Sequence, residues 1–248
     1  MKLSVFILFT FLTAIFFSCK KSETMTQPPA VVTAPVSGVV KLFDDGTTAL
    51  DNSGMSVSVE NSSPILTGIT ASTGKYIIAN VFYGSTNIIF EKPGYGTFKI
   101  FGIDHKSNAG AGSIIADTTK LGKISGTAIT ELSTAATVSS VDVILKTNPA
   151  SGSSSPKYVR LFLHVRNTVS SSVYLEFTDI KMIQGNPATI TFSKTELLGM
   201  GFTSGATVYV KAYGDSFWSN VYAEPGTSRS VFPNLNLTTV NAASFIVP

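Results

Sequence analysis

The sequence predicts an all-β protein made of two tandem β-sandwiches that follow a cleaved signal peptide. Charged residues make up only 13% of the 248 residues, and the chain holds 20 glycines. Serine, threonine and valine are plentiful, a composition that favours sandwich sheets over helical bundles. Short alternating apolar runs, broken by turn residues, recur along the chain as they do in antiparallel sheets. Outside the signal peptide, the nearest approach to a helical turn is residues 196–198.

The amino terminus has the layout of a secretory signal peptide. Lys2 is followed by an apolar run that reaches Phe17, which matches the basic and hydrophobic regions of such a signal. The run is short for a bilayer span, which needs about 20 residues, so an uncleaved anchor is the less favoured alternative. We therefore assign residues 1–18 to a signal peptide that is removed.

Cys19 is the only cysteine of the chain and directly follows Ser18. The pair resembles a lipobox, the site at which bacterial lipoprotein precursors are cleaved and lipidated. Phe16 and Phe17 differ from the Leu-Ala/Ser pattern of the strict motif, so the match rests on the position of Cys19. An exported chain with one cysteine cannot form an internal disulfide; the alternative is a buried or incidental thiol. We predict lipidation at Cys19.

Residues 19–35 are polar, contain prolines and lack periodicity, so they are predicted to form a tether. A lipid anchor at Cys19 makes the membrane one partner. We expect the cell envelope, in particular the outer membrane of a Gram-negative bacterium, and leave the periplasmic or surface face open. The net charge is only +3 and no basic run is present, so nucleic acid is not an expected partner.

Residues 36–124, the first module, alternate in short runs. Met55, Val57 and Val59 are predicted to face a core, while Ser56 and Ser58 face water. The expected strands of this module are residues 36–42, 55–60, 66–70, 75–80, 85–91, 96–102 and 112–124.

The order of glycines and tyrosines in the first module resembles that of the carboxypeptidase regulatory-like family. The matching positions are Gly74, Tyr76, Gly84 and the pair Gly94-Tyr95, while Ala71 stands where the family has an aspartate. The resemblance implies a seven-stranded transthyretin-like sandwich that is not a peptidase and occurs as a non-catalytic attachment on exported proteins. Glycine at 74 and 84 permits a positive φ, and Tyr76 is expected to fill the core.

Residues 125–248, the second module, continue the β rhythm with different turns. The spacing suggests an immunoglobulin-like or fibronectin-like sandwich. The expected strands are residues 126–131, 138–145, 158–166, 173–182, 188–192, 207–213, 221–223 and 236–246.

The strand at residues 158–166 carries basic residues on the face opposite its predicted core face. Arg160, His164 and Arg166 share that face with two aromatic residues. One interpretation is cross-strand pairing of Arg160 or Arg166 with Glu176, which contributes tenths of a kcal/mol. The other is an exposed patch that binds a partner protein or an acidic glycan.

A second candidate ligand site combines aromatic and acidic residues near the carboxyl end. Tyr213, Trp218 and Tyr222 lie close in sequence to Asp215. Exposed rings bind the apolar faces of sugars, and neighbouring carboxylates bind their hydroxyls. The alternative interpretation is that Trp218, the one tryptophan, is a core residue.

Residues suited to catalysis are sparse. His105 and His164 are the only histidines, and neither has metal-ligand spacing or a nucleophile motif beside it. We therefore expect no catalytic residue, no metal and no cofactor, although a carboxylate pair for glycoside hydrolysis leaves no spacing signal. Asp117-Thr118-Thr119 resembles a short bacterial O-glycosylation acceptor.

These features predict a non-enzymatic, lipid-anchored envelope protein that serves as a binding, spacer or assembly module. The alternative is a carbohydrate-binding surface lipoprotein that uses the Trp218 region. A glycoside or peptide hydrolase is a third, less favoured reading. The possible partners are a glycan or another envelope protein.

Overall fold

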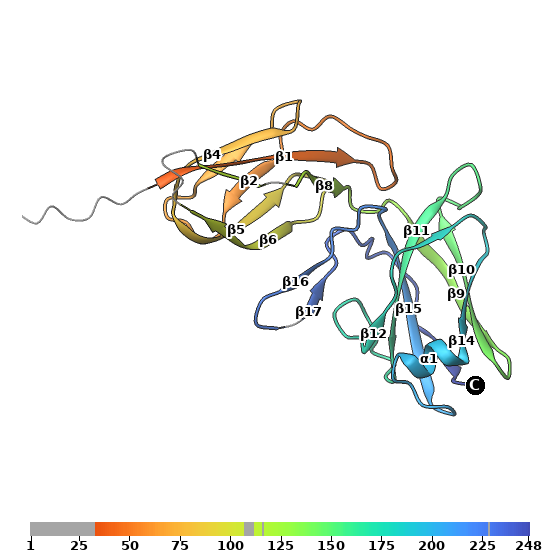
Figure 1. Ribbon diagram of the computed structural model, residues 1–248. Helices are drawn as coiled ribbons and strands as arrows, with labels where there is room; N and C mark the ends of the chain where they lie inside the picture. Colours follow the sequence, from red (N-terminus) through yellow and green to blue (C-terminus); the bar gives the residue numbers. More distant parts are fainter. Residues whose placement is uncertain (1–32, 107–111, 116, 228) are drawn as a thin grey trace, which may run out of the picture. The chain divides into compact units, whose positions relative to one another are not determined.

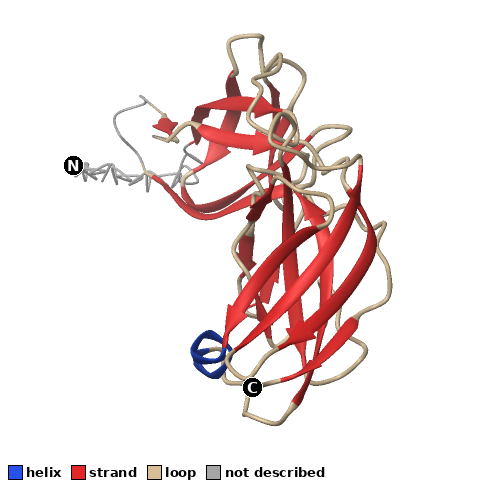
Figure 2. Ribbon diagram, turned by 90° about the vertical axis from the view of Figure 1, so that its right-hand side faces the viewer, coloured by secondary structure: helices blue, strands red, loops and turns tan. Residues whose placement is uncertain are grey.

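The computed structural model describes residues 33–106, 112–115, 117–227 and 229–248. The predicted signal peptide, the lipidation site at Cys19 and almost all of the tether lie outside these residues. The described part of the chain belongs to one compact unit. It is nearly all β, with one short helix among the described residues (Figures 1 and 2), so the predicted all-β fold class is confirmed. In the part of the chain that is described, no helix is long and apolar enough for a bilayer span.

The first module contains two four-stranded sheets (Figure 1). One sheet has the order β3 (Thr67–Ile69), β2 (Ser56–Val59), β5 (Gly84–Glu91) and β6 (Phe98–His105). The other is centred on β1 and contains β1 (Thr33–Phe43), β4 (Lys75–Phe82), β7 (Ser113–Ile114) and β8 (Thr119–Gly122). β4 pairs with β1 in the antiparallel sense, whereas β7 and β8 pair with it in parallel.

Strict alternation along β1 builds the core of the first module. Val36, Val40 and Leu42 are fully buried there, because alternate side chains of a strand point to one face. Tyr76 fills the same core, with its ring edge-on to Phe90, as the sequence predicted.

Gly74 holds the tight turn before β4. Its φ is +83°, and a Cβ at this position would lie 2.0 Å from the Val40 carbonyl oxygen. Both the backbone conformation and the close approach therefore require glycine. Gly84 also has a positive φ, as expected.

The second module contains a three-stranded and a five-stranded sheet together with a small hairpin. The three-stranded sheet has the order β14 (Ala188–Ser193), β10 (Ser140–Asn148) and β9 (Ala128–Ala136). The five-stranded sheet contains β12 (Glu176–Phe177), β11 (Lys157–His164), β15 (Thr207–Asp215), β18 (Ala243–Ile246) and β13 (Lys181–Ile183), which pairs with β11. The hairpin is β16 (Tyr222–Glu224) and β17 (Arg229–Val231).

The core of the second module draws side chains from both of its larger sheets, including Val143 of β10, Leu161 of β11 and Val210 of β15. The helix α1 (Lys194–Gly199) follows β14 and covers the predicted helical turn. Ser193 and Glu196 form a capping box at its start, which satisfies two of the amide groups that a helix end leaves free. The transthyretin-like and immunoglobulin-like assignments of the two modules stay predictions.

The expected strand at residues 173–182 is broken into β12 and β13. The Thr178 hydroxyl accepts a hydrogen bond from the Leu161 amide at 3.1 Å, and the Thr178 carbonyl accepts one from Arg160 at 2.7 Å. The Thr178 amide still donates to the Leu161 carbonyl at 3.0 Å, so side chains replace only the return bond of the regular ladder at this point. The sequence also missed β17, and the expected strand at 236–246 is confined to β18 and one isolated bridge of Asn236.

Candidate functional site

The four residues of the predicted aromatic platform do not form one exposed surface. Tyr213 and Asp215 are buried, and Trp218 and Tyr222 are half-buried. The Tyr222 ring packs against Phe98 of β6, with 5.9 Å between ring centroids.

Trp218 packs against residues of the first module. Its ring centroid lies 5.3 Å from that of Phe43, and the Lys120 ammonium lies 4.6 Å from the centroid of the indole. Its indole Nε1 is buried, with no hydrogen-bond partner among the described residues. The Trp218 ring is thus engaged by its own chain rather than presented as a flat sugar platform.

The loop Asp215–Asn220, which we call the junction loop, is hydrogen-bonded to the first module. The Phe217 amide donates to the Asp45 carbonyl at 3.0 Å. The Gly122 amide donates to the Asn220 side-chain oxygen at 2.9 Å. These bonds join residues far apart in sequence, so the junction loop connects the sheets of the two modules.

The Asn234 side chain also bonds the junction loop to the first module. Its side-chain amide nitrogen donates to the Trp218 carbonyl at 2.6 Å and to the Asn220 side-chain oxygen at 2.8 Å. Its own oxygen accepts a hydrogen bond from the Gly96 amide at 3.3 Å. The side chain is almost fully buried, so each of these bonds also satisfies a group that water does not reach.

Arg160 and Asp215 form a buried ion pair at the root of the junction loop. The Arg160 Nε donates to an Asp215 oxygen at 2.8 Å. The other Asp215 oxygen accepts the Ser216 amide, and the Arg160 guanidinium also reaches the Ser219 hydroxyl at 3.2 Å. Burial raises the pKa of the Asp215 carboxyl, while the Arg160 charge and the Ser216 amide act against that rise.

The predicted basic patch on the 158–166 strand is not assembled. Arg160 is buried, so it is not part of an exposed patch, and its acidic partner is Asp215 rather than the expected Glu176. His164 is half-buried and accepts the amide of the exposed Arg166. The reason is that β11 is covered on both faces, which a simple alternating pattern does not anticipate.

The second cover of β11 is an aromatic cluster that the sequence did not reveal. Phe162 is fully buried there, and its ring lies 4.8 Å from Phe232 and 5.5 Å from Tyr174. Arg160 lies over the Phe232 ring at 5.1 Å. These residues come from segments far apart in the sequence, so no local sequence pattern predicts that they are in contact.

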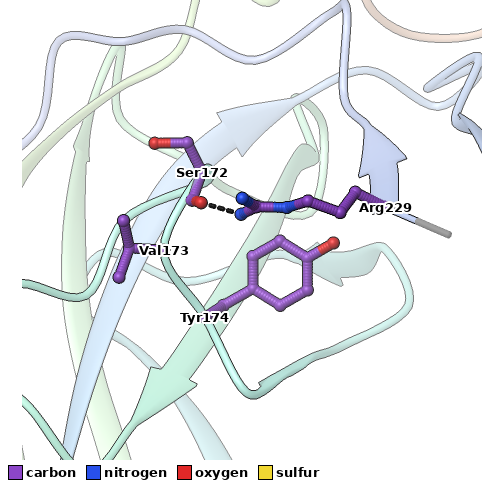
Figure 3. A pocket seen from close by; sticks show the side chains of 4 residues that line it. All are labelled: Ser172, Val173, Tyr174 and Arg229. Carbon is purple, nitrogen blue, oxygen red and sulfur yellow. Dashed lines mark hydrogen bonds between the residues drawn. The ribbon is translucent and has the colours of Figure 1, made fainter. Parts of the chain in front are cut away.

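A hollow of about 350 Å³ borders this cluster, lined by Ser172, Val173, Tyr174 and Arg229. Figure 3 shows the Arg229 guanidinium beside the Tyr174 ring, 5.9 Å from its centroid, and bonded to the Ser172 carbonyl. Arg229 is exposed and lies on β17. Sequence reasoning missed this pair because β17 itself was missed.

Groups suited to holding a metal ion are not assembled in the described residues. No three His, Cys, Asp or Glu side chains cluster there as metal ligands. His105 is buried between the Ser113 hydroxyl at 2.7 Å and the Val81 carbonyl at 3.2 Å, which is a structural role.

No protein-family model matches the sequence, and no curated protein matches it. Among solved structures, a provisionally assigned carbohydrate binding protein from Bacteroides uniformis is 15% identical, with a TM-score of 0.30; the match covers 86% of this chain and 99% of that one. A DUF3823 family protein from Bacteroides uniformis is 13% identical, with a TM-score of 0.26 and coverage of 88% and 100%. One from Parabacteroides merdae is 11% identical, with a TM-score of 0.24 and coverage of 82% and 98%. Likenesses at this level do not bear on function.

Proposed function

We propose that the protein is a non-enzymatic, lipid-anchored envelope protein whose β body serves as a binding, spacer or assembly module. The observation that supports this most is the set of contacts made by the side chains of the junction loop. Its aromatic and acidic side chains, the best candidates for a reactive or ligand-binding cluster, are engaged within the protein: Trp218 packs on Phe43 of the first module, and Asp215 pairs with Arg160 of the second. Two modules joined in this way suit a protein that keeps a binding surface at a distance from the membrane.

The proposed anchor rests on Ser18-Cys19 and the polar tether that follows. Thioether attachment of a diacylglycerol to Cys19, with further acylation, would give lasting membrane binding, because each buried CH₂ contributes about 0.8 kcal/mol. The test is labelling of the full-length protein with radioactive palmitate in the host cell. We expect a labelled band in wild type and in the control Ser22→Ala, and none in Cys19→Ala. Label retained in Cys19→Ala would refute the anchor.

The non-enzymatic part of the proposal also has a direct test. The full chain is incubated with panels of glycans and peptides, and released products are measured. We expect no turnover above that of a heat-denatured sample. Turnover that disappears when a single Asp or Glu is changed to its amide would show that the protein is an enzyme.

The resemblance of residues 36–124 to the carboxypeptidase regulatory-like family belongs to the same proposal, because such modules are non-catalytic attachments. Carbohydrate binding is the second candidate function. It is no longer favoured at Trp218, whose ring is half-buried against Phe43. The observation that favours it is the hollow beside Tyr174 and Arg229, where an aromatic ring and a cation lie side by side.

A further inference from the structure

Arg229 lines two hollows of the second module. The first, of about 350 Å³, is also lined by Ser172, Val173 and Tyr174 (Figure 3). The second, of about 270 Å³, also contains Ser172 and Arg229. The further residues that line it are Ser171, Glu224, Thr227, Ser230 and Val231. We call the two together the Arg229 hollow; the first of them by itself reaches the volume range of small-ligand sites.

We infer that the Arg229 hollow binds an acidic saccharide, with a uronate carboxylate held by the Arg229 guanidinium. This inference deepens the second candidate function and rests on it. It moves the expected glycan site away from Trp218 and Arg160 to side chains that the fold leaves accessible.

Arg229 has the donors that a carboxylate needs. A guanidinium carries five N–H groups in a planar fork. In this protein the Ser172 carbonyl accepts one hydrogen bond from Arg229, which fixes the side chain over the Tyr174 ring and leaves other N–H groups to donate. Charge-assisted, two-point bonds of this kind are short and directional.

Tyr174 supplies a fixed ring next to that cation. Its ring packs edge-on against Phe177 and Phe232, at 5.4 and 5.8 Å. Its hydroxyl accepts the Ser230 amide at 3.3 Å. A ring held in place by the aromatic cluster, lining the hollow and lying beside the Arg229 guanidinium, offers a fixed apolar surface that a sugar can contact at little entropic cost.

The remaining groups favour a sugar over a densely charged ligand. Glu224 lines the second hollow, where its carboxylate disfavours a ligand with several negative charges and accepts hydrogen bonds from hydroxyl groups. Ser171, Thr227 and Ser230 add donors and acceptors of the same kind. One cation, one carboxylate and several hydroxyls match a ligand with one acid group and many hydroxyls.

The test is isothermal titration calorimetry of the full chain in detergent micelles with an aldobiouronic acid, a disaccharide that carries a single uronate carboxylate. The matched ligands are its methyl ester, which has no charge, and a tri-aspartate peptide. The protein variants are Arg229→Gln, Arg229→Lys and the control Arg166→Gln, which removes an exposed arginine that does not line the hollow. Melting temperatures are measured for each variant, and the ester comparison is made on wild type, so the result does not depend on the folding of a variant.

We expect the aldobiouronic acid to bind wild type and Arg166→Gln equally, and to bind Arg229→Gln at least about ten-fold more weakly. Arg229→Lys should fall between, because a lysine keeps the charge and loses the fork. The ester should bind wild type as weakly as the acid binds Arg229→Gln.

Absence of aldobiouronic acid binding, equal binding of its ester, or full affinity in Arg229→Gln would each overturn the inference. Preference for the tri-aspartate peptide would also overturn it and point to a protein partner. Equal binding of the ester would leave carbohydrate binding at this hollow standing while removing the acidic site, whereas no binding of either sugar would remove carbohydrate binding there as well. Palmitate labelling at Cys19 tests the anchor separately.

Discussion

The Arg160 Nε lies 2.8 Å from an Asp215 carboxylate oxygen, and the two side chains are only 4% and 1% exposed. This ion pair links β11 to the end of β15, where the junction loop begins. Two charges this deeply buried are tolerated because further partners satisfy them, including the Thr178 carbonyl and the Ser216 amide. The pair therefore ties the aromatic cluster to the loop that connects the modules.

Removal of one partner should be costly. Asp215→Ala leaves the Arg160 charge buried without its counterion, so we expect a loss of about 3–5 kcal/mol in the free energy of unfolding. The control Asp142→Ala removes a carboxylate that accepts the exposed Thr191 hydroxyl and should change stability by no more than about 0.5 kcal/mol. Urea titration measures both. Equal stabilities of the two variants would contradict the role given to the pair.

Asn234 should matter more than its neighbour Asn236. Asn234→Ala leaves the part-buried Trp218 carbonyl and Gly96 amide without this partner, for a loss of about 1–3 kcal/mol. Asn236→Ala removes only a local bond to the Thr238 amide and should be nearly neutral. Chemical denaturation of both variants checks this, and a neutral Asn234→Ala would show that the junction bonds add nothing.

Gly74 and Gly205 separate backbone strain from steric clash. Both have φ near +83°, but a Cβ at Gly205 meets nothing within 4 Å, whereas one at Gly74 meets the Val40 carbonyl. Gly205→Ala should cost about 1–2 kcal/mol, the penalty for an L residue in this conformation. Gly74→Ala should cost clearly more. Thermal melts compare them, and equal losses would argue against the close approach at Gly74.

Glu60 should contribute a pH-dependent part of the stability. Its carboxylate accepts Lys99 at 2.7 Å and Asn87 at 2.8 Å, and these bonds lower the pKa of Glu60 below its ordinary value of 4.5. A lowered folded-state pKa stabilises the protein above pH 4.5, and this contribution is lost as the pH falls through the folded-state pKa.

The pair is partly exposed, so the effect is expected to be below about 1 kcal/mol. Glu60→Gln should therefore be less stable than wild type at pH 7, and the difference should shrink below pH 4.5. Urea midpoints from pH 3 to 7 provide the measurement, with Glu131→Gln, which breaks the exposed pair with Lys146, as a control. A constant difference across this range would contradict the assigned pKa shift.

The sequence predicted a strand well where one face of that strand is buried and the other is exposed to solvent. β1 and β10 follow this rule, and alternation located both. Gly74 and Tyr76 were also anticipated, because a turn that needs a positive φ and a core that needs an aromatic ring leave local signals.

Alternation failed where a strand is covered twice. Arg160 and Phe162 were expected on a wet face, yet both are buried beneath residues from the distant segments 174–177 and 232. No sequence pattern marked Arg229 as a site residue, because its partners Ser172 and Tyr174 lie far from it in the sequence. Contacts of this kind depend on the tertiary fold, so no spacing in the sequence announces them.

Trp218 is the only tryptophan of the chain, so tryptophan fluorescence reports on the junction between the modules alone. Its ring packs at that junction and is not a sugar platform. The measurement is acrylamide quenching of tryptophan fluorescence in the full chain, with and without neutral and acidic oligosaccharides.

We predict a quenching constant well below that of free tryptophan amide, no change on addition of glycans, and stronger quenching in Phe43→Ala, which removes the ring packed against the indole. A fully accessible Trp218, or one that glycans protect from acrylamide, would contradict the account.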